Sequence, residues 1–262
     1  MPQAHTSRDF ESELRELRAH SLAMGARCER GLQLALKAFW EGSTQLAAEV
    51  EELDRHIDRD EMDIDALVLR ILALRQPVAY DLRFLAAALR LVTDLERIGD
   101  EAVNIAERAK EEHGTAKDKV RGDLKTMGEQ SQEMLRDALD AFVQGESVRA
   151  EQVLVRDDAV DQLYGRIIQA MTDFMSQHPN QVAEAIRVIH VAKYLERVAD
   201  HGGVCNQCNV GASSSHPRLP DLGKRSVGSE FFLLRVESLV LDEQHRVAEP
   251  DGVLQQPVGF DR

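Results

Sequence analysis

The sequence has no excess of basic residues and few aromatic ones. Its 262 residues include 32 Lys and Arg against 46 Asp and Glu, so the formal net charge is −14, and only 5% are aromatic. Binding to a nucleic-acid backbone depends on clustered Lys and Arg that release counterions from the phosphates. The charge balance therefore argues against nucleic acid as the main partner and favours metal cations or basic protein surfaces.

Cysteine and long apolar runs are also scarce. The three cysteines, Cys28, Cys205 and Cys208, are too few and too unevenly spaced for a disulfide framework, which fits a reducing compartment. The first twenty residues contain no apolar stretch of the signal-peptide kind, and the most apolar run, 66–74, is interrupted by Arg70. We therefore expect a cytoplasmic protein without a membrane-spanning segment.

Helix breakers are rare in the first 200 residues and common after them. The last 62 residues hold 4 of the 7 prolines and 7 of the 16 glycines. Before that point Leu, Ala, Glu, Arg and Asp dominate, a composition that favours long helices. Ser43 or Thr44 is a fitting N-cap, and Pro77 and Pro179 are fitting first residues of helices. We expect six helices, at about 8–41, 44–76, 77–112, 117–145, 147–178 and from 179 onward.

The six segments contain one pattern twice. Residues 38–42, Ala-Phe-Trp-Glu-Gly, match residues 141–145, Ala-Phe-Val-Gln-Gly, and residues 94–100 match residues 194–200, at offsets of 100 to 103. A three-helix unit that occurs twice explains these matches. We therefore predict an all-α fold of two tandem three-helix bundles, with the first in residues 1–114 and the second, with a shortened last helix, in residues 115–201. Residues 202–262 are expected to form an irregular, poorly ordered tail.

The third expected helix carries a carboxylate on its apolar face. The face follows the alternating three- and four-residue spacing of a bundle seam and consists of Leu82, Leu85, Leu89, Val92, Glu96, Gly99, Val103 and Ala106. Burying a lone charge is costly. Glu96 therefore needs a charged partner, a proton or a metal ion.

Acidic residues four apart recur at matching positions in both copies. Residues at this spacing lie one turn apart on the same helix face, where like charges repel and a bridging cation reverses the sign of the interaction. If the second and third helices of a copy are antiparallel neighbours, its two pairs supply four carboxylates to one site. An all-oxygen site suits hard cations such as Mg²⁺, Mn²⁺, Ca²⁺ or iron better than Zn²⁺. The candidate metal ligands are Asp54, Asp58, Glu96 and Asp100 in the first copy and Asp157, Asp161, Glu196 and Asp200 in the second.

Other interpretations stay open from the residues alone. Acidic pairs also arise by chance on solvated faces, so the main alternative is a metal-free acidic scaffold that binds basic partner surfaces. A ferritin-like di-metal oxidase needs Glu-x-x-His, which the sequence lacks, so we expect no enzyme activity. Arg83, Arg90 and Arg97 recur every seven residues, and we expect them to pair with acids of a neighbouring helix rather than to bind phosphate.

Two motifs in the chain are closely similar to each other. They read Asp94-Leu-Glu-Arg-Ile-Gly-Asp-Glu-Ala-Val-Asn-Ile-Ala-Glu107 and Tyr194-Leu-Glu-Arg-Val-Ala-Asp-His201. Both resemble the PhoU family of phosphate-specific transport accessory proteins, and the resemblance covers about residues 9–201. It implies a repeated three-helix bundle that acts as a negative regulator of phosphate uptake and of the phosphate-starvation response. It also implies a homodimer whose partners are the ATPase of the phosphate ABC transporter and a sensor histidine kinase.

The family's metal motif is an acidic residue followed four positions later by Asp. It implies multinuclear clusters of divalent or trivalent metal ions, with iron, manganese, magnesium and zinc as candidates. Carried over residue by residue, the motif covers Glu96 with Asp100 and Glu196 with Asp200. The pairs Asp54/Asp58 and Asp157/Asp161 have the same spacing and match it less directly.

After His201 the sequence departs from the pattern of the first copy. It continues Gly-Gly-Val-Cys-Asn-Gln-Cys-Asn-Val-Gly, so we expect the sixth helix to end early. His201, Cys205, Cys208 and His216 form only part of a zinc-site pattern. We hypothesise that a change of reading frame produced the residues after about 202. Resequencing the gene tests this, and the absence of a helical continuation in the other frames would contradict it.

Overall fold

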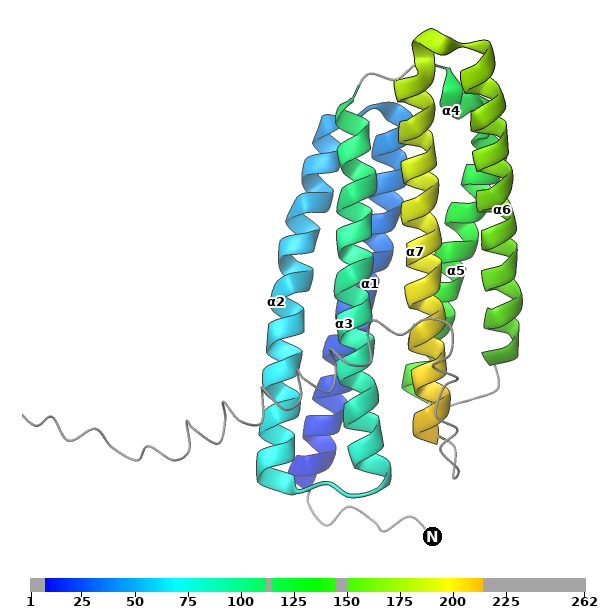
Figure 1. The fold of residues 1–262 in the computed structure, drawn as a ribbon. Helices are drawn as coiled ribbons and strands as arrows, with labels where there is room; N and C mark the ends of the chain where they lie inside the picture. The colour runs from blue at the N-terminus through cyan, green and yellow to red at the C-terminus, as the bar shows by residue number, and fades with distance from the viewer. Residues whose placement is uncertain (1–7, 112–114, 145–149, 214–262) are drawn as a thin grey trace, which may run out of the picture. The chain divides into compact units, whose positions relative to one another are not determined.

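The computed structural model describes residues 8–111, 115–144 and 150–213 of the chain. These residues form helices and no strand, as the sequence predicts (Figure 1). The short helices η1 and η2 are 3₁₀ turns. In chain order the helices are α1 (Arg8–Glu41), α2 (Thr44–Arg75), α3 (Tyr80–Glu107), η1 (Arg108–Lys110), α4 (Ala116–Lys119), α5 (Arg121–Gln144), α6 (Ala150–Gln177), η2 (Pro179–Gln181) and α7 (Val182–Ser213).

The long helices form two groups of three that follow each other in the chain. Helices α1, α2 and α3 pack together, and so do α5, α6 and α7, with α1 against α5 and α3 against α7 joining the groups (Figure 1). The prediction of two tandem three-helix bundles is confirmed. The cores are apolar, and the largest fully buried side chains of the first group include Leu17, Met24, Leu32, Ile57, Ile64, Leu85, Leu95 and Ile98. No helix within the described ranges has the length and apolar character needed to span a membrane.

The turn between α2 and α3 differs from the expectation. Ser43 caps α2 as predicted, because its side chain accepts a hydrogen bond from the Leu46 amide. At the other end, Gln76 terminates α2 in the left-handed conformation with φ 47°, and Ala79 also has a positive φ of 49°. Pro77 lies in the turn between them, so the prediction that it opens α3 is wrong.

The last helix is longer than the sequence suggested. Helix α7 continues to Ser213, so the expected early end near His201 is wrong. Gly202 lies inside α7 where this helix contacts α5. A Cβ at this position would lie 3.4 Å from the Leu135 amide nitrogen on α5, an ordinary van der Waals distance. The side chains of Cys205 and Cys208, and residues 214–262 with His216, lie outside the described part of the chain.

The linker between the two bundles is anchored on both of them. The Ala116 amide at the start of α4 donates a hydrogen bond to Glu184 Oε1 of α7 at 2.5 Å. Next to it, the buried Lys117 ammonium donates to the carbonyl oxygens of Phe39 and Trp40 at 3.2 and 3.0 Å. A cation suits this position because the carbonyls at a helix C-terminus carry partial negative charge. The contacts tie α4 to the end of α1 and to the start of α7.

A reciprocal contact joins α1 to α5. A Cβ on Gly25 of α1 would lie 2.5 Å from Leu139 Cδ2 of α5, and a Cβ on Gly128 of α5 would lie 2.7 Å from Leu36 Cδ1 of α1. Gly128 and Leu139 follow Gly25 and Leu36 by 103 residues each, the offset at which the two copies match. The two bundles therefore contact each other through equivalent residues on antiparallel helices, as expected for an approximate two-fold axis.

Alanine substitutions separate this contact from helix propensity. We expect Gly25→Ala to destabilise the protein, because crowding a packed core costs about 1–3 kcal/mol whereas Gly to Ala in a helix gains only about 1 kcal/mol. The matched control is Gly165→Ala in α6, where a Cβ meets no atom within 4 Å and only the gain remains. Urea unfolding of both variants measures the difference. Stabilisation by Gly25→Ala equal to that by Gly165→Ala would contradict the tight contact.

Candidate metal centre

The two acidic pairs of the first bundle lie together between α2 and α3. Asp58 and Asp100 both raise the pKa of Asp54, and Asp100 and Asp58 raise the pKa of Glu96, so the four carboxylates are close enough to repel one another. The antiparallel arrangement of α2 and α3 that the sequence suggested produces this neighbourhood. We call these four residues together with Glu61 the α2–α3 carboxylate cluster.

Burial and mutual repulsion both oppose ionisation of this cluster. Burial is the largest cause of the rise in the pKa of Asp54 to about 6, followed by the charges of Asp58 and Asp100. Burial also raises the pKa of Glu96 to about 7, with repulsion by Asp100, Glu61 and Asp58. The pKa of Asp100 also rises, first because the protein around its carboxyl displaces part of its hydration and then because Asp58 repels its charge. A cation placed among these oxygens would remove the repulsion and favour the ionised forms.

Asp54 is the most constrained carboxylate of the cluster. Its Oδ1 atom is buried and has no hydrogen-bond partner among the described residues. A Cβ added to Gly99 on α3 would lie 2.9 Å from this oxygen, so Asp54 fits only because residue 99 has no side chain. Asp58 and Asp100 are exposed, while Asp54 and Glu96 are partly buried. The cluster thus combines an inner oxygen that lacks a partner with outer oxygens that solvent reaches.

Sequence reasoning missed Glu61. Its charge raises the pKa of Glu96 across the helix pair, so it lies beside the four predicted ligands. The signal was present in the spacing, because residues 54, 58 and 61 follow the i, i+4, i+7 pattern of one helix face. Asp65 continues this face one turn further and is buried. The acidic face of α2 is therefore longer than the single pair that was identified.

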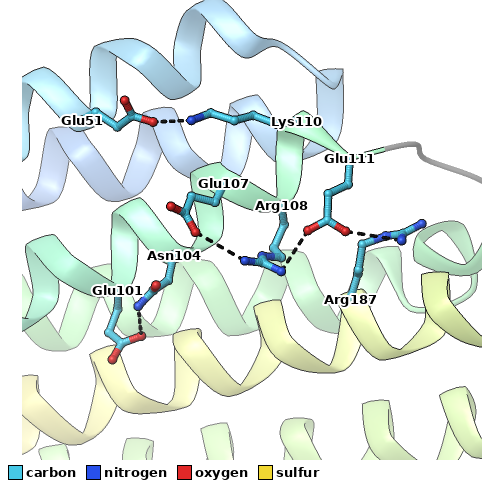
Figure 2. Close-up of polar contacts among 8 residues, drawn as sticks. All are labelled: Glu51, Glu101, Asn104, Glu107, Arg108, Lys110, Glu111 and Arg187. Carbon is cyan, nitrogen blue, oxygen red and sulfur yellow. Dashed lines mark hydrogen bonds and ion pairs between the residues drawn. The ribbon is translucent and has the colours of Figure 1, made fainter.

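The opposite side of the α3 motif faces the second bundle. Asp94 Oδ1 lies 3.1 Å from His201 Nδ1, and Glu101 Oε1 lies 2.8 Å from Arg197 Nη1, both on α7. Asn104 donates a hydrogen bond to Glu101 at 3.1 Å (Figure 2). One stretch of α3 therefore presents Glu96 and Asp100 to α2 and binds α7 through Asp94 and Glu101.

The family model of the PhoU domain matches the chain twice, over residues 22–109 and 124–203. The chain belongs to the PhoU family. Both matches contain one of the two motifs quoted above, so the internal repeat is the repeat of this domain.

Relatives and solved structures agree with this assignment. The phosphate-specific transport system accessory protein PhoU homolog of Pseudomonas putida is 39% identical over 201 residues, which cover 75% of this chain and 77% of that protein. The crystal structure of PhoU from Pseudomonas aeruginosa is 34% identical and matches with a TM-score of 0.72 over 78% of this chain and 98% of its own. The crystal structure of the phosphate transport system regulatory protein PhoU from Streptococcus pneumoniae is 25% identical, with a TM-score of 0.68 over 79% and 98%.

The second PhoU repeat differs from the first at its predicted ligands. Glu196 is buried and its carboxylate lies 2.5 Å from the ammonium of Lys193, where the first repeat has Thr93. Asp157 and Asp200 are partly buried and Asp161 is exposed. Ala199 occupies the position that corresponds to Gly99, and its Cβ is incompatible with the approach that Asp54 makes in the first repeat. The two repeats therefore do not offer equal sites.

Metal binding stays a prediction for both repeats. Throughout the described ranges, no three acidic, His or Cys side chains are arranged to hold one ion. In the first repeat the orphaned Asp54 oxygen and the all-carboxylate composition fit a hard cation. In the second repeat Lys193 already neutralises Glu196.

One arginine of the α3 stripe contacts an acid of its own helix. Arg97 Nη1 lies 4.0 Å from the buried Asp94, and Arg83 is exposed. That the stripe pairs with acids of a neighbouring helix stays a prediction.

The raised pKa of Glu96 predicts how the stability of the metal-free protein depends on pH. A carboxyl with a higher pKa in the folded state takes up a proton on folding between its ordinary pKa, 4.5, and its folded pKa, about 7. Its contribution to stability is therefore present at low pH and is lost as pH rises through this range. We expect Glu96→Gln to flatten the fall of the urea midpoint between pH 4.5 and 7.5 in chelator. Glu129→Gln, at an exposed position on α5, is the control, and parallel profiles for Glu96→Gln and wild type would contradict the prediction.

Proposed function

We propose that this PhoU-family chain is a cytoplasmic regulator of phosphate uptake and of the phosphate-starvation response. The observation that carries the proposal is the match of the PhoU domain to both repeats, together with relatives named as accessory proteins of the phosphate-specific transport system. In this role the chain acts by binding, as a negative regulator without catalytic activity. Its partners are the ATPase of the phosphate ABC transporter and a sensor histidine kinase, and it works as a homodimer.

Metal binding at the α2–α3 carboxylate cluster is the second part of the proposal. Asp54, Asp58, Glu96 and Asp100 would hold the ion, with Glu61 beside them. A hard cation supplies charge neutralisation there, and iron, manganese, magnesium and zinc are the candidates. Once the charge of the cluster is neutralised, the facing surfaces of α2 and α3 would pack without repulsion. Since the same stretch of α3 binds α7, a change at the cluster reaches the second repeat through Asp94 and Glu101.

The second repeat is proposed to bind metal more weakly, through Asp157, Asp161, Glu196 and Asp200. An ion there must displace the Lys193 ammonium from Glu196 and does not gain an approach like that of Asp54. We therefore expect the first repeat to fill before the second.

A metal-free acidic scaffold is the alternative function. It is supported by the excess of acidic residues, 46 Asp and Glu against 32 Lys and Arg. In that case the acidic surface of a chain with net charge −14 recruits basic patches of partner proteins directly.

Elemental analysis of variants separates the two functions. We expect Glu96→Gln/Asp100→Asn to lower bound metal per chain and to remove the metal-dependent gain in melting temperature, because two of the cluster's carboxylates become neutral amides. The protein is stripped with chelator, loaded with Mn²⁺, Fe²⁺, Mg²⁺ or Zn²⁺, desalted and measured. Glu196→Gln/Asp200→Asn is the matched control and should lose less metal. No metal in wild type with any of the four ions would leave the scaffold as the function.

Complementation tests the regulatory role. In a bacterial strain without its own PhoU, we expect this chain to repress a reporter of the phosphate-starvation response when phosphate is plentiful. The control is the same chain with the helix-breaking substitution Leu95→Pro in the core of α3, which removes the fold. The role in that host would be refuted if the reporter were equally active with the wild-type chain and with Leu95→Pro. For this test the wild-type chain must be present at the level that PhoU has in the parent strain.

A further inference from the structure

A single carboxylate bridges two arginines where the two repeats meet. Glu111, just after η1, has Oε1 at 2.9 Å from Nη1 of Arg108 and Oε2 at 3.3 Å from Nη1 of Arg187 (Figure 2). Arg108 belongs to the end of the first repeat and Arg187 to α7 of the second. Each oxygen of the carboxylate therefore binds a guanidinium from a different repeat.

The two arginines are partly withdrawn from water. Their side chains are 23% and 22% exposed, against 35% for Glu111. Arg108 also has an Nε donor that is buried and has no acceptor among the described residues. A carboxylate offers two oxygens to these forks, whereas a tetrahedral oxyanion offers four and carries more charge at neutral pH. Arg108 therefore has a donor that Glu111 does not use.

Among the described residues, the neighbouring charges leave the Nε donor of Arg108 without an acceptor. Glu107 is about half exposed and lies 3.4 Å from Nη2 of Arg108, a long contact for a charged pair. Lys110 is already paired with Glu51 of α2 (Figure 2). Glu111 itself lies just after η1, in an extended conformation with φ −95° and ψ 156°, and its amide donates a hydrogen bond to the Arg108 carbonyl oxygen at 3.5 Å.

We propose that Arg108 and Arg187 form a binding site for inorganic phosphate and that Glu111 is its internal competitor. Free phosphate displaces the Glu111 carboxylate from the two guanidiniums and takes the unused Nε donor of Arg108. The site rests on these contacts alone, while the choice of phosphate among tetrahedral oxyanions rests on the proposed function. Binding is weak in wild type because Glu111 is always present beside the arginines.

Displacement of Glu111 has a structural consequence. It removes the link between Arg187 of α7 and Glu111 at the end of η1. Phosphate thereby replaces the contact between Glu111 and the second repeat with its own contacts to the same two arginines. The contact between the two repeats then depends on the concentration of phosphate.

Equilibrium dialysis with labelled inorganic phosphate tests the site directly. The full chain is measured in chelator, so that no metal-bound phosphate contributes, and at constant ionic strength set with chloride. We expect Glu111→Gln to bind phosphate about tenfold more tightly than wild type, which corresponds to about 1.4 kcal/mol. Arg187→Gln should bind phosphate at least about tenfold more weakly than wild type, which corresponds to about 1.4 kcal/mol or more. Sulfate should compete for the site, and acetate should compete poorly.

Two further variants distinguish loss of the phosphate site from loss of the fold. Arg187→Lys keeps the charge but lacks the planar fork, so it should bind with intermediate affinity. Arg166→Gln removes a comparable ion pair with Asp123 in the second repeat and should bind like wild type. Circular dichroism verifies the helices of each variant. Equal affinity in Glu111→Gln and wild type, or in Arg187→Gln and Arg166→Gln, overturns the site.

The result is separable from the regulatory role. Phosphate binding that follows these variants, in a chain that fails to repress the reporter, leaves the site standing and refutes only the function. Repression by wild type with no difference among the variants in dialysis leaves the function standing and refutes the site.

Discussion

Desolvation of like charges between α2 and α3 is the constraint around which the first repeat is built. Burial is the largest cause of the raised pKa values of Asp54 and Glu96, ahead of any neighbouring charge. Fully buried apolar side chains hold the two helices together beside these groups, among them Ile57, Leu95 and Ile98. Each contributes about 1.5–3 kcal/mol, whereas repulsion between acids four apart on a helix costs roughly 0.2–0.5 kcal/mol. Packing therefore outweighs this repulsion and fixes the carboxylates side by side.

The second repeat solves the same problem differently. It places an ammonium beside its buried acid, through Lys193 and Glu196, and it has alanine where the first repeat needs glycine. In the second repeat the ammonium balances the charge of the buried acid, whereas in the first repeat burial and neighbouring acids raise the pKa values of Asp54 and Glu96. Two residues thus account for the contrast between repeats that share their helices and their motif. The linker with Glu111 lies between these two unlike halves and contacts both.

Much of the fold followed from local signals in the sequence, and the errors arose where tertiary contacts decide. The N-cap at Ser43 and the repeat offsets gave the helices and their grouping. Pro77 was assigned wrongly because the left-handed Gln76 ends α2, which propensity does not encode. The glycine at 202 was interpreted as a helix end, although it lies inside α7 beside α5.

The candidate site was predictable only in part for the same reason. Spacing identified the eight acids, and their neighbourhood in the first repeat followed from antiparallel helices. Glu61 was overlooked because the search used pairs four apart rather than the whole face of α2. The contact between Lys193 and Glu196 joins residues three apart, a spacing at which sequence alone does not distinguish a solvated pair from a buried one.

The reciprocal contact of Gly25 with Leu139 and of Leu36 with Gly128 has a meaning beyond stability. Two equal patches related by a two-fold axis are the geometry of an isologous homodimer, in which residue i of one subunit meets residue j of the other and the reverse. One three-helix unit with this patch is able to meet a copy of itself in the same way. The chain is therefore equivalent to such a dimer fused into one polypeptide. Fusion lets the two halves carry different residues, so that one half keeps an acidic face and the other neutralises it, which a dimer of identical subunits cannot do.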